Sequence, residues 1–455
     1  MTSPNHAITR LISLGALAAL AATASADVLT VDDAVRIALQ NSPSLKNSGA
    51  NVLDAQGALK QAYSGVLPHV NGSVTRFGQS VVNQSGGRNV GGVITNTPIN
   101  YDFESHGTNP TLSGTWNVLD LAAIGGVSAA KKTARSSELT LQSTRNDVVY
   151  GTKQQFYEVV KAVWLSAVSD SALRLARDNE RRVRALFEVG SVSKSDLLVA
   201  QVATGNAQLD SLTQSQNAIS QRVLLAEVLG IKESEMPDVD REFQMAPESF
   251  DESGLLTEAT KARPDLHAAD AELAAARASV GAARWSYLPF VTLVGSMTFN
   301  PTSTSTSTAK LSGQPPNVNG TRNETDRESS GSVALNWDLF DGLAREGRNQ
   351  SANARLIRAQ EGRDALYRNL QSEVHRVVLL HQAVVVGEEV AQRSLESAQE
   401  SMKLNREKYN VGSATILDLI NAQVSYQRAA ANLVSARAAI KVAEARIAQV
   451  RGQAY

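Results

Sequence analysis

The chain contains one fifteen-residue pattern twice, about half its length apart. Residues 187–201 read FEVGSVSKSDLLVAQ and residues 409–423 read YNVGSATILDLINAQ, so the second begins 222 residues after the first. Seven positions are identical in register, among them the central Val-Gly-Ser and the later Asp-Leu. The fold must build the same local structure twice, and an internal repeat constrains the architecture more than any other pattern.

The repeat extends well beyond this pattern. Three shorter segments recur 221 residues apart: SPSL and RPDL at Pro43 and Pro264, VLPHV and YLPFV at Pro68 and Pro289, and TWNVLD and NWDLFD at Trp116 and Trp337. We therefore predict a first structural repeat over 27–230, an acidic, proline-containing linker over 231–262, and a second repeat over 263–455.

The N-terminus has the features of an export signal. Arg10 precedes the short apolar run LISLGALAALAAT, and Ala24-Ser25-Ala26 has the small residues that signal peptidase recognises. We expect residues 1–26 to be removed and the mature chain to be exported. Beyond residue 26 no apolar run of about 18 residues occurs, so no membrane-spanning α-helix is predicted.

Both repeats predict the same order of elements. A helical segment (about 44–65 and 265–286) stops at Leu-Pro, because proline lacks an N–H and its ring clashes with the preceding turn. Two strands follow, and then a helix of roughly 67 residues, about 100 Å long at 1.5 Å per residue, over 121–188 and 343–409.

The last helix contains a heptad pattern. Large side chains recur every seven residues, and alanines recur three places after them: Leu419, Tyr426, Leu433, Ile440 and Ile447, with Ala422, Ala429, Ala436 and Ala443. Alanine at alternate seam positions lets helices approach closely, which favours a helical tube.

The predicted strands have two different faces. In SVALNWDLF, Val333, Leu335 and Trp337 alternate with polar residues, as in a sheet with one apolar side. The Gly-, Ser- and Thr-rich segments 84–107 and 301–330 have no apolar period, and we expect exposed loops there. Four strands are too few to close a membrane barrel, which needs about eight. The chain must therefore oligomerise, and two, three or four copies would supply 8, 12 or 16 strands.

Composition excludes several classes of function. The 44 basic and 45 acidic residues nearly cancel, so no nucleic-acid partner is predicted. Cysteine is absent, and the histidines after residue 26 form no pair at the i, i+4 spacing of a helical metal site. With no nucleophile motif either, we expect no catalytic residues, no metal, no cofactor and no enzymatic activity.

The Leu-Pro strand starts, the Trp-Asn and Trp-Asp strands, the paired Val-Gly-Ser turns and the export signal together resemble the TolC-type outer-membrane efflux protein family, the outer membrane factors. The resemblance implies a mixed, mainly α fold, in which long antiparallel helical hairpins form an α-barrel. It implies a homotrimer whose four strands per chain form a 12-stranded β-barrel in the outer membrane of a Gram-negative bacterium, with the helical tunnel in the periplasm.

The resemblance also implies the function and the partners. The trimer would be the exit duct of a tripartite efflux or type I secretion system, gated at its periplasmic helical tips. Its partners would be a periplasmic adaptor protein, an inner-membrane pump reached directly or through the adaptor, and outer-membrane lipid. The competing class is a soluble periplasmic coiled-coil scaffold protein, in which the strands form a small sandwich.

The duplicated pattern would then lie at the tips. The resemblance assigns adaptor contact to the turn residues: Val189, Gly190, Ser191, Val411, Gly412 and Ser413. Glycine is needed in any such turn, because it adopts a backbone conformation that other residues reach only with strain.

The resemblance places a pore constriction at Asp418 and Asn421. Ser193-x-x-Asp196 and Thr415-x-x-Asp418 also fit a capping box, in which the carboxylate satisfies a free backbone N–H, and that role alone accounts for the recurrence. Three copies of Asp418 around a threefold axis would attract cations.

Tyr409 and Asp196 match a gate constraint of the family, the alternative being that Tyr409 only packs at a hairpin end. Asn421 and Ala414 depart from the family pattern, where an aspartate and an arginine stand, so we expect a less charged and looser gate.

Overall fold

The computed structural model describes residues 28–82, 86–90, 93–243, 250–311 and 317–453. The predicted signal peptide lies outside these ranges. The chain divides into two compact units, which we call the tip unit and the sheet unit. The tip unit contains the described parts of 1–41, 151–247 and 384–442; the sheet unit contains those of 42–150, 248–383 and 443–455. Each unit combines segments of both predicted repeats, and the division of the chain at 231–262 stays a prediction.

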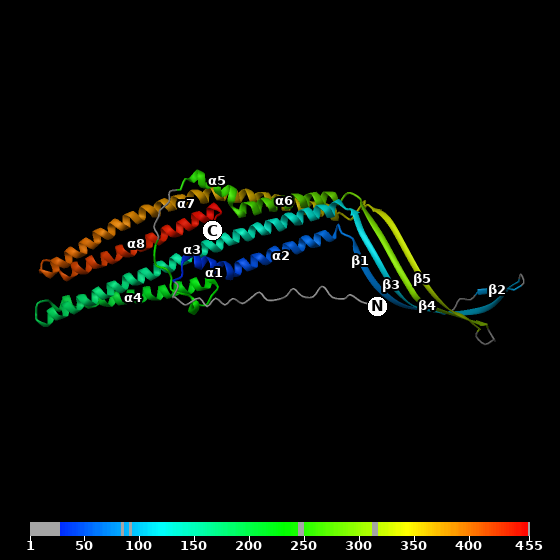
Figure 1. Cartoon of the computed structure of the whole chain (residues 1–455), viewed down its shortest axis with the longest axis horizontal. Helices are drawn as coiled ribbons and strands as arrows, with labels where there is room; N and C mark the ends of the chain where they lie inside the picture. Colours follow the sequence, from blue (N-terminus) through cyan, green and yellow to red (C-terminus); the bar gives the residue numbers. More distant parts are fainter. Residues whose placement is uncertain (1–27, 83–85, 91–92, 244–249, 312–316, 454–455) are drawn as a thin grey trace, which may run out of the picture. The chain divides into compact units, whose positions relative to one another are not determined.

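Equivalent elements follow one another in the two halves of the chain (Figure 1). The first half contains α1 (Val31–Asn41), α2 (Pro43–Ser64), β1 (His69–Val82), β2 (Gly86–Val90), β3 (Val93–Leu119), α3 (Leu121–Glu188), α4 (Lys194–Leu229) and a short 3-10 turn η1 (Glu233–Glu235). The second contains α5 (Glu252–Ala262), α6 (Pro264–Trp285), β4 (Phe290–Leu311), β5 (Asn317–Asn336), α7 (Ala344–Asn410) and α8 (Ile416–Arg451). None of the described helices is long and apolar enough to cross a membrane.

Two short helices, α1 and α5, were missed by the sequence analysis. The Thr30 hydroxyl accepts from the Asp33 backbone N–H and donates to the Asp33 carboxylate, a cap of the same form as that expected at Ser193. The Asp251 carboxylate likewise accepts from the Gly254 N–H at the start of α5. Both caps were readable from the sequence, so the signal was present.

The sheet unit holds an antiparallel sheet in the order β1-β3-β4-β5, with β2 also paired to β3. The strands extend far into the segments expected to be loops: residues 93–107 belong to β3, and much of 301–330 belongs to β4 and β5. That expectation was wrong, because a β-ladder is made by backbone hydrogen bonds and does not need an apolar period. Threonine, frequent in β4, also favours strands.

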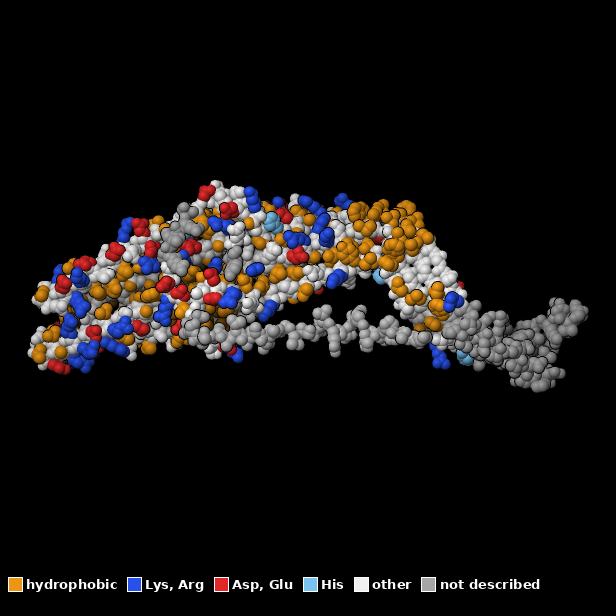
Figure 2. Space-filling view, in the orientation of Figure 1, with side chains coloured by type: hydrophobic (Ala, Val, Ile, Leu, Met, Phe, Trp, Pro, Cys, Tyr) orange, Lys and Arg blue, Asp and Glu red, His pale blue; other side chains and the backbone are white. Residues whose placement is uncertain are grey.

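The helix-proximal half of the sheet has one apolar and one polar face. The apolar face is exposed and includes Val70, Val74, Leu112, Trp116, Met297, Val333 and Leu335. On the other face Asn336 donates to Thr292 (3.1 Å), and Thr292 donates to Asn117 (3.0 Å), so polar side chains bridge three strands. The predicted alternation is therefore present where the helices meet the strands, and Figure 2 shows hydrophobic side chains gathered there.

The two equivalent tryptophans have equivalent hydrogen bonds. The Trp116 indole N–H donates to the Val66 carbonyl (3.0 Å), and the Trp337 indole N–H donates to the Tyr287 carbonyl (3.2 Å). Both residues remain partly exposed, at 40% and 60%, so neither is a core tryptophan in this chain. An exposed ring with a satisfied N–H is typical of residues at a membrane interface.

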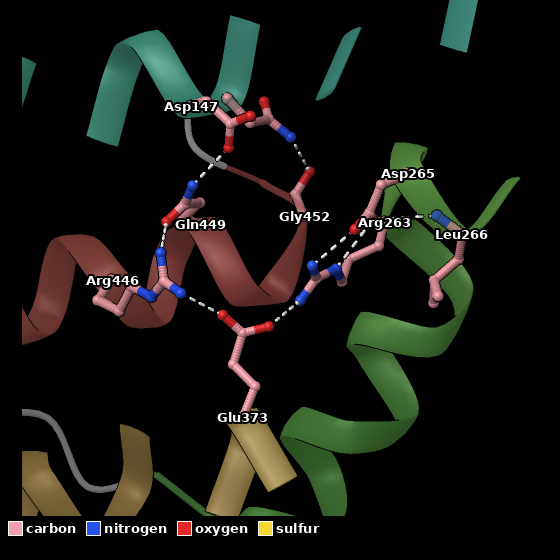
Figure 3. A network of polar contacts seen from close by, with 9 residues as sticks. Asp147, Arg263, Asp265, Leu266, Glu373, Arg446, Gln449 and Gly452 are labelled. Carbon is pink, nitrogen blue, oxygen red and sulfur yellow. Dashed lines mark hydrogen bonds and ion pairs between the residues drawn. The ribbon is translucent and has the colours of Figure 1, made fainter. Parts of the chain in front are cut away.

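A polar network joins α3, α6, α7 and α8 within the sheet unit (Figure 3). Arg263 donates two hydrogen bonds to Asp265 (3.0 and 2.7 Å) and one to Glu373 (2.8 Å), and Glu373 also pairs with Arg446. Burial alone would lower the pKa of Arg263, but these carboxylates outweigh it and raise the pKa. The backbone of Gly452, whose φ is +83°, lies close to the backbone at Arg263. A Cβ added to Gly452 would be 2.9 Å from the backbone nitrogen of Arg263.

Most of the heptad seam predicted for α8 is buried, whereas Tyr426 and Ala436 are partly exposed. In the tip unit Leu419, Leu433 and Ile440 are almost fully covered, together with the alanines at 422 and 429. Within that unit the ends of α3, α4, α7 and α8 form two antiparallel hairpins, which present the duplicated pattern at their turns. This arrangement places the candidate site.

Candidate gate at the hairpin tips

Both hairpins turn at the glycine of the duplicated pattern. Gly190 and Gly412 have φ of +76° and +78°, the left-handed region that favours glycine. The glycine N–H bonds to the carbonyl three residues back, and the following serine N–H bonds to the carbonyl five residues back (2.8 Å for Ser191, 2.9 Å for Ser413). These are Schellman motifs, which satisfy the free carbonyls at the ends of α3 and α7.

The aspartates of the pattern cap the returning helices. Ser193 and Asp196 exchange hydrogen bonds at the start of α4, and Thr415 and Asp418 do the same at the start of α8. The hydroxyl and backbone N–H of Thr415 lower the pKa of the exposed Asp418 carboxyl. The capping role of both aspartates is therefore present in the chain. Asp418 and Asn421 are both exposed, and their role in a constriction stays a prediction.

The structure does not join Tyr409 and Asp196 by a hydrogen bond. The Tyr409 hydroxyl is buried without a hydrogen-bond partner among the described residues, while Asp196 bonds to Ser193. Burial, and secondarily the nearby Asp196 charge, raise the pKa of Tyr409. Tyr409 packs against the apolar cluster of Val183, Ala200, Ile416 and Leu419. The gate role of this pair stays a prediction.

Three hydrogen bonds that the sequence analysis missed join the two hairpins. Arg182 donates to Asn410 (2.8 Å), Asn179 donates to Gln423 (2.7 Å), and Gln427 donates to Asp210 (2.7 Å). These pairs are 217 to 244 residues apart in the chain, so no local pattern announces them. Their residue types are common on exposed helix faces, and only the tertiary structure makes them partners.

A cavity of about 230 Å³ lies between α3, α4 and α8 beside these bonds. Alanines line much of it, and Gln423 and Gln427 border it with Trp164 and Tyr426. The side chains of the two hairpins leave this space between them.

Comparison with known proteins identifies the family. The model of the family described as "Outer membrane efflux protein" matches residues 34–231 and 255–453, which is most of the chain. The chain belongs to the outer membrane efflux protein family. The predicted family, the location in the outer membrane and the class of function, an exit duct for efflux or secretion, are thereby confirmed.

Several characterised proteins are similar to this member of the outer membrane efflux protein family. The outer membrane protein TolC of Escherichia coli is 21% identical over 87% of this chain and 77% of its own. Protein CyaE of Bordetella pertussis is 27% identical over 87% of this chain and 78% of its own. The pyoverdine export outer membrane protein OpmQ of Pseudomonas aeruginosa is 25% identical over 86% and 78%.

Solved structures support the fold. The CmeC outer membrane channel of Campylobacter jejuni superposes with a TM-score of 0.76 at 18% identity, covering all of this chain and 95% of that one. The outer membrane protein VceC of Vibrio cholerae gives 0.72 at 19% identity over 93% and 96%. The predicted fold, which is mainly helical and includes an antiparallel sheet of four long strands, is confirmed. Family members are channels rather than enzymes.

Proposed function

We propose that three copies of this chain form a closed duct, with a 12-stranded barrel in the outer membrane and a helical tunnel in the periplasm. The observation that supports this most is the open sheet. Its four long strands leave β1 and β5 at the edges, and one face near the helices is apolar and exposed. Exposed edges and an apolar face are unfavourable in water, whereas twelve strands from three copies would close the edges and bury the face in lipid.

In this proposal the six hairpin tips form the gate. Asp418 and Asn421 would line the constriction, with three carboxylates facing a threefold axis. The bonds from Asn179, Arg182 and Gln427 would hold each second hairpin against the first. Opening of the gate then requires these hydrogen bonds to break. In another state of the gate, the hydroxyl of Tyr409 would be available to bond to Asp196.

The tips would also bind the adaptor through which an inner-membrane pump delivers substrate. Val189 and Val411 are 74% and 79% exposed at the two turns, although valine is apolar. Exposed apolar residues at equivalent points of both hairpins suit contact with another protein. With Gly190, Ser191, Gly412 and Ser413 they would form six similar docking points around the trimer.

Fractionation and conductance test this function. The full chain is expressed in a Gram-negative host that lacks its own exit duct, and membranes are separated on a density gradient. We expect a detergent-extractable trimer in the outer-membrane fraction that forms conducting pores in planar bilayers. Recovery in the soluble periplasmic fraction without detergent would refute the duct and favour the scaffold.

A further inference from the structure

The cavity between α3, α4 and α8 has the size of a binding site for a small molecule. It lies wholly within the tip unit, and its volume is about 230 Å³. A dry protein cavity of about 150 Å³ is large enough to bind benzene, whereas pockets for drug-sized ligands have roughly 300 to 1,000 Å³. The cavity therefore fits a molecule larger than one aromatic ring, such as two fused rings.

Hydrogen bonds between each pair of the three helices fix the walls of this cavity. The Thr204 hydroxyl of α4 donates to the Ala176 carbonyl of α3 (3.3 Å), and the Ser211 hydroxyl of α4 donates to the Asp170 carboxylate of α3 (2.6 Å). The two amide bonds described above join α8 to α3 and to α4, at 2.7 Å each. A ligand would therefore enter a site whose walls are already ordered, which favours binding.

The residues that line the cavity favour an uncharged aromatic ligand. No acidic or basic side chain is among the described residues that line it, so a charged ligand would lose its hydration without gaining an oppositely charged partner. Alanines and larger aliphatic residues make up most of the lining, together with Trp164 of α3 and Tyr426 of α8. Aromatic side chains attract another ring in offset or edge-to-face arrangements.

Two amide side chains give the cavity a polar edge. Gln423 accepts from Asn179 through its Oε1, and Gln427 donates to Asp210 through its Nε2. Among the described residues, the Nε2 of Gln423 and the Oε1 of Gln427 have no hydrogen-bond partner. A hydroxyl group both donates and accepts, so one ring hydroxyl matches these two amide ends.

The cavity is coupled to the bonds between the hairpins. Gln423 and Gln427 line it, and both also bond to the first hairpin. A molecule in the cavity would contact the first hairpin at Trp164 and the second at Tyr426 only while the hairpins are joined. A ligand that binds one state better than another shifts the population toward that state, which here is the joined and closed one.

We propose that this cavity binds an uncharged, hydroxyl-bearing aromatic molecule of about two fused rings, and that the bound molecule holds the gate closed. This inference rests on the proposed function as a gated duct and adds a regulatory site to it. At a free ligand concentration of about ten times Kd, the ratio of open to closed pores would fall about elevenfold for each copy. If the three copies open together, the fall is on the order of a thousandfold.

Calorimetric titration of the full-length trimer in detergent with naphthol tests the binding site. Ala207→Leu fills the cavity from α4, and Ala176→Leu fills it from α3, which provides a second variant if the first does not assemble. The matched control is Ala218→Leu, at a half-buried alanine of α4 that does not line the cavity. We expect saturable binding to the wild type and the control, and only unsaturable uptake by the micelle with the filled variants. Saturable binding to the filled variants, or none to the wild type, would overturn the proposal.

Single-pore recordings in planar bilayers test the effect on the gate. Naphthol should lower the open fraction of the wild type and of Ala218→Leu, and it should leave that of Ala207→Leu and Ala176→Leu unchanged. An equal effect on all variants would place its action in the bilayer and contradict the gating role. Saturable binding by a trimer that forms no pores would refute the proposed duct, whereas conducting pores without saturable binding would refute only the ligand site.

Discussion

The bond between Asn179 and Gln423 allows the gate proposal to be tested quantitatively. The two amides join α3 to α8 at 2.7 Å in a half-buried position beside the cavity. A neutral hydrogen bond of this kind contributes about 1 kcal/mol. If the three copies open together, loss of this bond from all three destabilises the closed state of the trimer by about 3 kcal/mol. The ratio of open to closed pores then rises roughly a hundredfold.

The assay is a double-mutant cycle in planar bilayers. Asn179→Ala, Gln423→Ala and the double variant are compared with the wild type for the fraction of time that single pores are open. Each single variant should raise this fraction, and the double variant should raise it no further than the larger single effect, because the bond is already lost.

Ser425→Ala is the matched control, since among the described residues the Ser425 hydroxyl bonds to the Asn421 carbonyl within α8 and to no other partner. It should leave the open fraction unchanged. Independent, additive effects of Asn179→Ala and Gln423→Ala would refute the reasoning, because they would show that the two side chains do not act through a shared bond.

Two further predictions concern charge and backbone. Hydrogen bonds from Thr415 lower the pKa of Asp418 below its ordinary value of 3.8 in the single chain, whereas three such carboxylates around a threefold axis would repel one another and raise it, so the charge is lost as the pH falls through the pKa of the ring. Reversal potentials should show cation selectivity that is present at neutral pH, declines on acidification and is weaker in Asp418→Asn; unchanged selectivity in that variant would leave Asp418 as a cap only. Gly412→Ala should cost about 1 kcal/mol for its positive φ, whereas Gly452→Ala should cost more, because its Cβ would also lie 2.9 Å from the backbone at Ala262 and Arg263. Thermal loss of helical circular dichroism checks this order, and equal midpoints would mean that α5 moves aside without cost.

The sequence alone predicts the local structure of this protein well. The long helices follow from long stretches without proline, the two turns follow from Gly190 and Gly412, and the start of α8 follows from Thr415 and Asp418. Each of these features depends on residues within a few positions of one another, so a single chain segment contains the whole cause. The family resemblance also rests on such local segments, because their order occurs twice in the chain.

Only the tertiary structure decided the partners of these segments. The Arg182–Asn410 and Asn179–Gln423 bonds, the Arg263–Glu373 pair and the pairing of the threonine-rich half of β4 with β3 all join residues that are distant in sequence. The sequence of a polar helix face is the same whether that face contacts water or another hairpin. The sequence of a polar strand likewise does not differ from that of a loop, because only pairing with a neighbouring backbone makes it a strand. Long-range partners are chosen by packing and register, which the chain acquires only when it folds.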